Sequence, residues 1–358
     1  MKRRVSSLLA EWYAQGHRDL PWRRTTDPYR IWVSEIMLQQ TRAAAVVPYY
    51  HRFLERFPTV ETLAGAGEPE VLALWSGLGY YSRARNLLRA ARQVAARSAF
   101  PRQYDELRQL PGIGDYTAAA VASIAFGEPR AVLDGNVLRV VARMENDAGD
   151  IRTPKTRERF RAVAESWLNR RQPGAFNQAL MELGATVCLP RRPLCPECPL
   201  RGQCQARQQG TVDQLPVKLG AIRPQRIEAV LLLVRRGRRI LLRQRPATER
   251  RMAGFWDLPE PAHLPGARRG VTIGQFRHTI THHHYTFTVK AAGAPKRLPA
   301  GSVFRWLEPC EASRIPLSTT ARKALRLAGL LGAPDGRAKA TSRLCDWRQV
   351  NALRSLPQ

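Results

Sequence analysis

The chain has 358 residues, 44% of them hydrophobic, and its 58 basic against 29 acidic side chains give a formal net charge of +29. Such a length predicts two domains, each with a real hydrophobic core. The sequence lacks a run of about 18 apolar residues, so we expect no membrane span. The excess of cations favours a polyanionic partner, most simply a nucleic acid, over compositional drift.

The basic N-terminus has a short apolar run interrupted by Glu11. It is typical of a helix in a mature protein rather than of a signal peptide. We therefore expect a reducing compartment, the cytoplasm, in which disulfides are rare.

Residues 1 to about 205 are predicted to be helical, because apolar residues recur there at spacings of three and four. The pattern is clearest in "VSSLLAEWY", "IWVSEIMLQQ", "NLLRAARQVAAR" and "TAAAVASIAF". Short Gly/Pro stretches separate these helices. The segment 210–226 has no strong periodicity and is expected to be a linker.

After this linker the pattern changes to that of strands. "IEAVLLLVRRGRRILLRQRP" predicts a hairpin that turns at "RRGR", "HHHYTFTVKA" and "SVFRWLEP" predict further strands, and "STTARKALRLAGLL" predicts a helix. The expected fold class is therefore multidomain, with an all-α domain over 1–209 and a smaller α/β domain over 227–332. Residues 333–358 carry little pattern, as in a disordered tail.

Glu35 occupies an apolar helix face. In the predicted helix its same-face neighbours are Ile31, Trp32 and Leu38, and no Lys or Arg lies three or four residues away. Burial disfavours a charged carboxylate and raises its pKa, which would make Glu35 a general acid at neutral pH. A buried Glu paired with a distant Arg, or one exposed by an imperfect face, fits this stretch equally well.

"LPGIGDYTAAAVASIAFG" predicts a tight hairpin and then a helix that begins near Asp115. Gly112 and Gly114, on either side of Ile113, permit a tight turn and a close approach to another molecule. The free N–H groups at the helix start form an anion site, so we expect the hairpin to hold a DNA phosphate without reading sequence. An ordinary helix–turn–helix corner is the alternative.

"VLDGNVLRVVAR" places Asp134 as the N-cap of a helix over Asn136 to Arg143. This structural role alone accounts for the residue. The functional alternative is an ionised carboxylate that faces a developing cation. With Glu35 as the acid, it would form a pair like the one that cleaves glycosides, by analogy.

Four of the six cysteines lie within "CLPRRPLCPECPLRGQC", at Cys188, Cys195, Cys198 and Cys204. Two disulfides, a zinc ion and an iron–sulfur cluster are all compatible with four thiols at this spacing. A reducing compartment argues against the disulfides.

In combination, the chain resembles the helix–hairpin–helix DNA glycosylases and, within them, the adenine DNA glycosylases of the MutY type. The matching stretches are "LPWRRTTDPYRIWVSEIMLQQT", "WSGLGYYSRARNL", "LPGIGDYTA", "LDGNVLRV", "MELGATVC" and the cysteine loop. They cover most of residues 18–204 in order. The resemblance implies two helical lobes with DNA between them, in a monomeric, nucleoid-associated bacterial enzyme.

The resemblance also implies one 4Fe-4S cluster on Cys188, Cys195, Cys198 and Cys204, with zinc as the alternative. Arginines at 191, 192 and 201 would meet phosphates, so the cluster is expected to be structural and DNA-binding rather than redox-active.

The implied reaction is removal of adenine mispaired with 8-oxoguanine or guanine in double-stranded DNA. Glu35 would protonate N7 of the flipped adenine, and Asp134 would stabilise the resulting sugar oxocarbenium or capture it covalently. Water activated by deprotonated Glu35 would complete the hydrolysis. Tyr116 and Asn136 would orient this site.

Two further groups of residues match the family. Residues that resemble the lining of the adenine pocket are Arg18, Trp22, Arg23 and Glu182. Residues that resemble those entering the base stack and contacting the opposite 8-oxoguanine are Gln40, Thr41, Leu78 and Tyr80. Core packing for the apolar and aromatic residues, and a solvated face for the arginines, are the alternatives.

Related endonuclease III enzymes use a Schiff-base lysine just after the hairpin, where this chain has Tyr116. No lysine occurs from residue 3 to residue 154. We therefore expect a monofunctional glycosylase that leaves an abasic site. The missing lysine argues against a pyrimidine glycosylase/lyase of the endonuclease III type. The presence of Glu35 and Asp134 argues against a DNA-binding module that has lost its chemistry.

The segment from about 227 to 330 resembles the MutT-like, Nudix-type domain of this family, most clearly at "MAGFWDLPE". The acidic Mg²⁺-binding helix of catalytic Nudix proteins is missing from the sequence, so we expect no pyrophosphatase activity. The loop that recognises 8-oxoguanine, Phe-Ser-His in the family, aligns with Ile280, Thr281 and His282. Ile in place of Phe removes a stacking surface, and the His-rich run is also compatible with a metal site.

Overall fold

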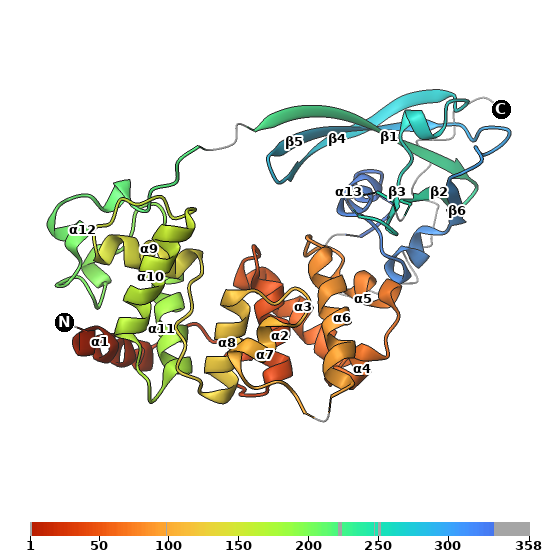
Figure 1. The fold of residues 1–358 in the computed structure, drawn as a ribbon. Helices are drawn as coiled ribbons and strands as arrows, with labels where there is room; N and C mark the ends of the chain where they lie inside the picture. The colour runs from red at the N-terminus through yellow and green to blue at the C-terminus, as the bar shows by residue number, and fades with distance from the viewer. Residues whose placement is uncertain (1, 98, 221–223, 247, 250–251, 333–358) are drawn as a thin grey trace. The chain divides into compact units, whose positions relative to one another are not determined.

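The computed structural model describes residues 2–97, 99–220, 224–246, 248–249 and 252–332 (Figure 1). The chain divides into two compact units. The helical unit comprises Met1–Gly65 and Asn86–Ala221, and the sheet unit comprises Ala66–Arg85 and Ile222–Gln358. The predicted tail over 333–358 lies outside the described residues.

Helices make up the regular structure of the helical unit, as predicted from the apolar spacing. Its elements are α1 (Lys2–Gln15), η1 (Pro21–Arg23), α2 (Pro28–Leu38), α3 (Ala43–Arg56), α4 (Val60–Ala64), α6 (Ser82–Ala95, whose first turn belongs to the sheet unit), α7 (Tyr104–Arg108), α8 (Asp115–Phe126), α9 (Gly135–Met144), α10 (Pro154–Trp167), α11 (Pro173–Thr186), η2 (Cys195–Glu197), α12 (Gln205–Gln208) and η3 (Val212–Gln214).

Helices α9 and α11 pack together within one hydrophobic core of this unit. α9 buries Val137, Val140 and Val141, and α11 buries Leu180 and Leu183. Spacings of three and four put these residues on one face of each helix. The packing fixes the N-terminus of α9, where Asp134 is the N-cap as the sequence predicted.

The first half of the predicted linker packs onto the helical unit. Leu215 is buried in its core, and Arg143 Nε donates hydrogen bonds of 3.0 Å to the carbonyl oxygens of Val212 and Leu215. The segment 210–226 gave no sign of this packing, because the apolar residues that meet the core, Val212, Leu215 and Val217, do not follow a helix or strand period.

The sheet unit contains a mixed sheet with helix α13 beside it (Figure 1). Its elements are α5 (Glu68–Trp75), β1 (Gln225–Arg236), β2 (Arg239–Gln244), β3 (Trp256–Asp257), η4 (Pro261–His263), β4 (Arg269–Ile280), β5 (His283–Ala292), β6 (Val303–Leu307), η5 (Pro309–Arg314) and α13 (Thr319–Leu327). The strand order is β3-β2-β1-β5-β4, and β6 pairs with β2.

β1 and β2 form the predicted hairpin, with Arg236 opposite Arg239. β1 runs parallel to β5, and β5 runs antiparallel to β4. Leucines that alternate along β1 face opposite sides, so the sheet buries apolar residues on both faces. The predicted fold class, an all-α domain followed by a smaller α/β domain, is confirmed.

Two features of the sheet unit were not expected from the sequence. β4 was not among the predicted strands, and residues 66–85 group with the C-terminal part of the chain rather than with the helices that surround them in sequence. Among the described residues, none of the helices is long and apolar enough to cross a membrane.

Candidate active site

A pocket of about 930 Å³ opens in the helical unit, bounded by residues of α2, α8, α9 and α11 and of the segment between 18 and 44. The predicted site residues that line it are Arg18, Trp22, Arg23, Glu35, Gln40, Thr41, Tyr116, Asp134 and Asn136. The fold therefore brings both predicted carboxylates, 99 positions apart in the sequence, to the same cavity.

Glu35 lies in the last turns of α2, a helix that begins at Pro28 and is capped by the Asp27 carboxylate. The Glu35 side chain is 4% exposed. Burial raises its pKa to about 7, a hydrogen bond from Tyr116 acts in the opposite direction, and the charge of Asp134 adds to the rise. A carboxyl group with this pKa is partly protonated at neutral pH and can act as a general acid.

Tyr116 belongs to the first turn of α8 and reaches the pocket from the opposite wall. Its hydroxyl donates a hydrogen bond of 2.5 Å to Glu35 Oε2, and Met181 Sδ lies 3.2 Å from the same hydroxyl oxygen. Burial and the Glu35 carboxylate raise the pKa of Tyr116, so the phenol remains neutral and acts as a donor.

Asp134 caps α9 and faces the pocket at the same time. Its Oδ1 accepts hydrogen bonds from the backbone N–H of Asn136 (2.9 Å) and of Val137 (2.7 Å), and its Oδ2 accepts one of 2.9 Å from Asn136 Nδ2. Burial raises the pKa of Asp134, whereas these three donors stabilise the ionised carboxylate. The atoms that cap α9 are thus the same ones that present a carboxylate to the pocket.

Arg139, which sequence reasoning missed, holds Asn136 in place. Its Nη2 donates 2.9 Å to Asn136 Oδ1 and 2.5 Å to the carbonyl of Gly184, and its Nε donates 2.6 Å to the carbonyl of Cys188. A Cβ at Gly184 would lie 2.6 Å from the Asn136 Cβ, so a glycine is needed there. No local pattern in the sequence indicated this role, because the same-face neighbours of Arg139 include Asn136 and Arg143 rather than apolar residues alone.

Glu182 does not line the pocket but anchors two arginines that do. Its Oε1 accepts a hydrogen bond of 2.8 Å from Arg18 Nε, and its Oε2 accepts bonds of 2.6 Å from Arg18 Nη2 and from Arg23 Nη2. Burial acts to raise the pKa of Glu182, but the bonds from Arg18 and Arg23 outweigh it and lower the pKa to about 2. Trp22, between these arginines in sequence, is buried and packs edge-on against Tyr50.

The residues expected at the base stack differ in exposure. Gln40 and Thr41 line the pocket, and Gln40 has a left-handed backbone at φ 57°. Tyr80 is 46% exposed at φ 48°, whereas Leu78 is 7% exposed, as the packing alternative expects.

The hairpin between α7 and α8 has two glycines with different surroundings. Gly112 has φ 79°, and a Cβ there would lie 2.6 Å from the Asn86 Cβ. Gly114 is the N-cap of α8, makes no side-chain cap and has open space around its Cα. Ile113 is buried and its N–H bonds to the carbonyl of Leu110, so the α8 end of the hairpin carries the available amide groups.

The four loop cysteines line one small pocket, together with Arg143 and Arg201. All four are free thiols. Burial raises the pKa of Cys198 to about 12, and the thiols at 188, 195 and 204 add to the rise. In the part of the chain that the structure describes, no group of three or more His, Cys, Asp or Glu side chains is placed to hold a single metal ion.

Buried polar atoms beside these thiols have no hydrogen-bond partner among the described residues. They are Arg143 Nη2 and both polar side-chain atoms of Gln203. Arg143 Nη1 lies 3.3 Å from Cys188 Sγ. An unpaired guanidinium nitrogen on the arginine that bonds Cys188 fits a site for an anionic thiolate-bound group.

Thr281 and His282 form the two-residue turn between β4 and β5, where Ile280 pairs with His283. Both turn residues are exposed, and Thr281 has φ 53°. The aligned loop is therefore the tip of a hairpin.

Residues 33–166 match the model of the HhH-GPD superfamily of base excision DNA repair proteins, and residues 229–327 match a NUDIX domain. Fold and site together define a helix–hairpin–helix DNA glycosylase. The chain is 34% identical over 398 residues to the human adenine DNA glycosylase, covering 89% of this chain and 73% of that protein. It is 46% identical over 222 residues to the rat enzyme, covering 58% of this chain and 43% of that protein.

The chain belongs to the adenine DNA glycosylase family, enzymes that hydrolyse N-glycosyl bonds. Among solved structures it resembles a thermostable thymine-DNA glycosylase (30% identity, TM-score 0.53, 58% of this chain and 97% of that one). An endonuclease III–DNA covalent intermediate shares the fold (23% identity, TM-score 0.50, 58% and 96% coverage).

Proposed function

We propose that this protein removes adenine paired with 8-oxoguanine, or with guanine, from double-stranded DNA and leaves an abasic site. The observation that carries the proposal is the convergence of Glu35, with its pKa near 7, and of Asp134, held by three hydrogen-bond donors, on one pocket. Relatives named adenine DNA glycosylase support adenine as the substrate.

The two carboxyl groups divide the chemistry. Protonated Glu35 gives its proton to N7 of an adenine turned out of the helix, and the C1′–N9 bond breaks with its electron pair going to the base. Asp134 stabilises the positive sugar, as an ion pair or by a covalent bond. Glu35, now ionised, takes a proton from the water that adds to C1′. Tyr116 and Asn136 orient these carboxylates, and the arginines held by Glu182 shape the pocket wall.

Duplex DNA is the proposed partner of a monomeric enzyme. The net charge of +29 supplies the electrostatic attraction, and the open α8 start at Gly114 suits a backbone phosphate. Tyr80 and Gln40, with Thr41, are proposed to fill the space that the adenine leaves. Thr281 and His282, at the tip of the β4–β5 hairpin, are proposed to contact the opposite 8-oxoguanine.

The proposed domain limits are those expected from the sequence, with a glycosylase domain over 1–209 and a recognition domain over 227–332. Between β3 and β4, the sequence carries a single carboxylate, Glu260. One carboxylate is too few for the Mg²⁺ ions of a pyrophosphatase, so we propose recognition without hydrolysis for the sheet unit.

Cys188, Cys195, Cys198 and Cys204 are proposed to hold one 4Fe-4S cluster. A zinc ion on the same four cysteines is the alternative. The four cysteines line one small pocket, and four thiolates are the ligand set that a 4Fe-4S cluster would take there. When bound it would cross-link the loop that follows α11, and its positive irons would keep the four thiols ionised.

The test uses purified protein and a duplex with one adenine opposite 8-oxoguanine, and a second with adenine opposite guanine. Free adenine is measured, and strand cleavage is measured with and without alkali. We expect adenine release from both duplexes and cleavage only after alkali. The Glu35→Gln variant should release none, whereas Glu55→Gln, a change at an exposed site on α3, should match the wild type.

Cleavage without alkali would instead assign a lyase of the endonuclease III type. Tight binding to both duplexes without adenine release would assign a non-catalytic reader of the mispair. Either result would contradict the proposed monofunctional reaction.

A further inference from the structure

Adjacent tyrosines in the segment 66–85 have opposite environments. Tyr80 is 46% exposed and Tyr81 is 6% exposed. Arg83 Nη2 donates hydrogen bonds to the carbonyls of Leu78 (3.2 Å) and Gly79 (3.1 Å), and its guanidinium lies 5.5 Å from the Tyr80 ring centre. Arg83 thus fixes the backbone of the loop that carries Tyr80.

Tyr81 packs against residues from the C-terminal part of the chain. Its ring centre lies 4.0 Å from that of Phe255, which is fully buried. Its hydroxyl lies 3.4 Å from Thr319 Oγ1 and accepts a bond of 3.4 Å from the N–H of Gly77. A single side chain therefore links the Tyr80 loop to the residue that precedes β3 and to the start of α13.

Ser76 makes a second link to the same place. Its hydroxyl donates 2.8 Å to the carbonyl of Leu317 and accepts 3.0 Å from Arg322 Nε. Leu317 pairs with Trp256 of β3. We call Phe255, Leu317 and Thr319 the platform, because Tyr81 and Ser76 both rest on them.

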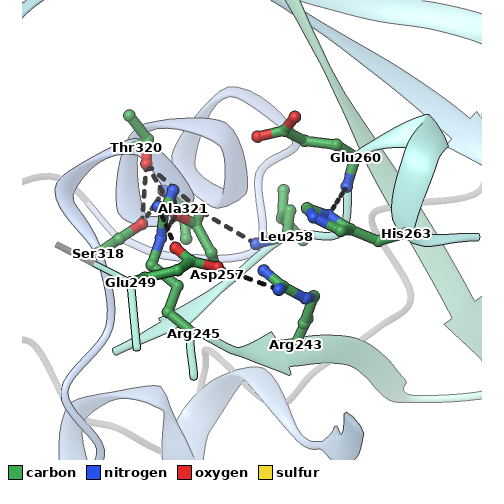
Figure 2. Close-up of polar contacts among 10 residues, drawn as sticks. All are labelled: Arg243, Arg245, Glu249, Asp257, Leu258, Glu260, His263, Ser318, Thr320 and Ala321. Atoms are coloured by element: carbon green, nitrogen blue, oxygen red, sulfur yellow. Dashed lines mark hydrogen bonds and ion pairs between the residues drawn. The ribbon is translucent and has the colours of Figure 1, made fainter. Parts of the chain in front are cut away.

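A buried polar network fixes the platform (Figure 2). Asp257, 4% exposed, accepts a bond of 3.0 Å from Arg245 Nη2 and one of 3.3 Å from Thr320 Oγ1. Ser318 caps α13 by accepting from the N–H of Ala321 at 2.9 Å. Figure 2 shows Asp257 of β3 between Arg245, which follows β2, and Thr320 in the first turn of α13, so the network joins the segments that carry the platform.

Helix α13 connects the platform to the β4–β5 hairpin. Lys323 Nζ donates 3.2 Å to the carbonyl of Arg277 on β4. A Cβ at Gly274 would lie 3.0 Å from Leu327 Cδ2, so helix and strand approach closely. Because β4 ends at the turn of Thr281 and His282, packed elements run without a break from that turn to Tyr80.

We infer that Tyr81 and Ser76 are positioning residues that set Tyr80 in register with the Thr281–His282 turn, so that discrimination of 8-oxoguanine from guanine depends on the platform. This inference rests on the function proposed above. The sheet unit would then act twice, by contacting the opposite base at the turn and by holding Tyr80. Neither residue touches the substrate, and both act through Tyr80.

The test compares the wild type with Tyr81→Leu and Tyr81→Phe. Single-turnover adenine release is measured on duplexes with adenine opposite 8-oxoguanine and opposite guanine, and 2-aminopurine next to the opposite base reports stacking. We expect Tyr81→Leu to lower the ratio of the two rates at least about fivefold and to weaken the stacking signal. Tyr81→Phe, which keeps the ring on Phe255, should retain both.

A double-mutant cycle with His282→Ala completes the test. If the platform couples the two sites, His282→Ala should have a smaller effect on the rate ratio in the Tyr81→Leu background than in the wild type. If Tyr81→Leu fails to fold, the rate ratio and the stacking signal are measured with Ser76→Ala, which removes only one hydroxyl.

Equal loss of both rates with an unchanged ratio, or additive effects in the cycle, would overturn the inference and leave only structural roles. In that case the proposed function would still stand, provided that the wild type releases adenine faster opposite 8-oxoguanine than opposite guanine. A wild type that releases no adenine from either duplex would overturn the proposed function and the inference with it.

Discussion

The Tyr116 hydroxyl donates a hydrogen bond of 2.5 Å to Glu35 Oε2 across the pocket. It stabilises the ionised carboxylate against burial, and the pKa of Glu35 is about 7. Because Glu35 must be protonated to act as the acid, we expect single-turnover adenine release to fall about tenfold per pH unit above that pKa. A rate that stays constant or rises through the alkaline range would contradict this role.

Tyr116→Phe should move the alkaline limb to higher pH. The change removes the donor that favours ionised Glu35, so the pKa of the carboxyl group should rise further. The pH–rate profile measures the shift, with Tyr104→Phe as a control because that hydroxyl bonds Asp115 instead. An unchanged limb, or one at lower pH, would show that the bond does not control Glu35.

Glu35→Gln should stabilise the fold at alkaline pH. The pKa of Glu35 rises from 4.5 to about 7 on folding, so wild-type stability falls as the pH climbs between these values, by about 3 kcal/mol in all. Below about pH 4 the carboxyl is protonated in both states and the variant should gain little. Melting temperatures across this range, with Glu55→Gln beside them, test the prediction. A gain that is independent of pH would refute it.

Alanine at Gly112 and at Gly114 should have different effects. Gly112 has φ 79° and Asn86 against it, so Gly112→Ala should lower the melting temperature as well as DNA affinity. Gly114 has open space, so Gly114→Ala should fold normally while its methyl group blocks a phosphate. Thermal unfolding and binding to an undamaged duplex separate the two. Normal binding by Gly114→Ala would remove the hairpin from the DNA contact surface.

Iron removal should unfold the cysteine loop. Cys204→Ser should abolish the visible absorption of the cluster, lower the iron content from about four atoms per chain and weaken DNA binding. Cys310→Ser, at an exposed thiol outside the loop, should change none of these. One zinc atom per chain in the wild type would contradict the proposed cluster.

The parts of the site that depend on near neighbours were predictable. Asp134 caps α9 because cap and first turn are consecutive in sequence. Glu35 is buried because its same-face neighbours are apolar. Arg139 was not predictable in this way, because its same-face neighbours include Asn136 and Arg143 and its carbonyl partners at Gly184 and Cys188 are more than 40 positions away.

Contacts between distant segments were not predictable. Glu182 and Arg18 are separated by 164 positions, and no local pattern shows that the glutamate holds the arginine rather than lining the pocket. β4 was missed because its apolar residues Val271, Ile273, Phe276 and Ile280 do not keep a two-residue spacing, and the strand has register shifts in its first half. Residues 66–85 join the sheet unit through Ser76 and Tyr81, whose partners lie more than 150 positions away.

Asp134 is both the N-cap of α9 and a proposed catalytic carboxylate, so a substitution there can lower protein abundance as well as activity. Loss of an N-cap carboxylate costs about 1 kcal/mol, and a loss of that size lowers the amount of folded protein that survives in a cell. An Asp134→Ala variant should therefore be both less abundant in the cell and inactive. Asp134→Asn keeps an oxygen for the helix cap but not the negative charge, so it should yield folded protein in normal amount without activity.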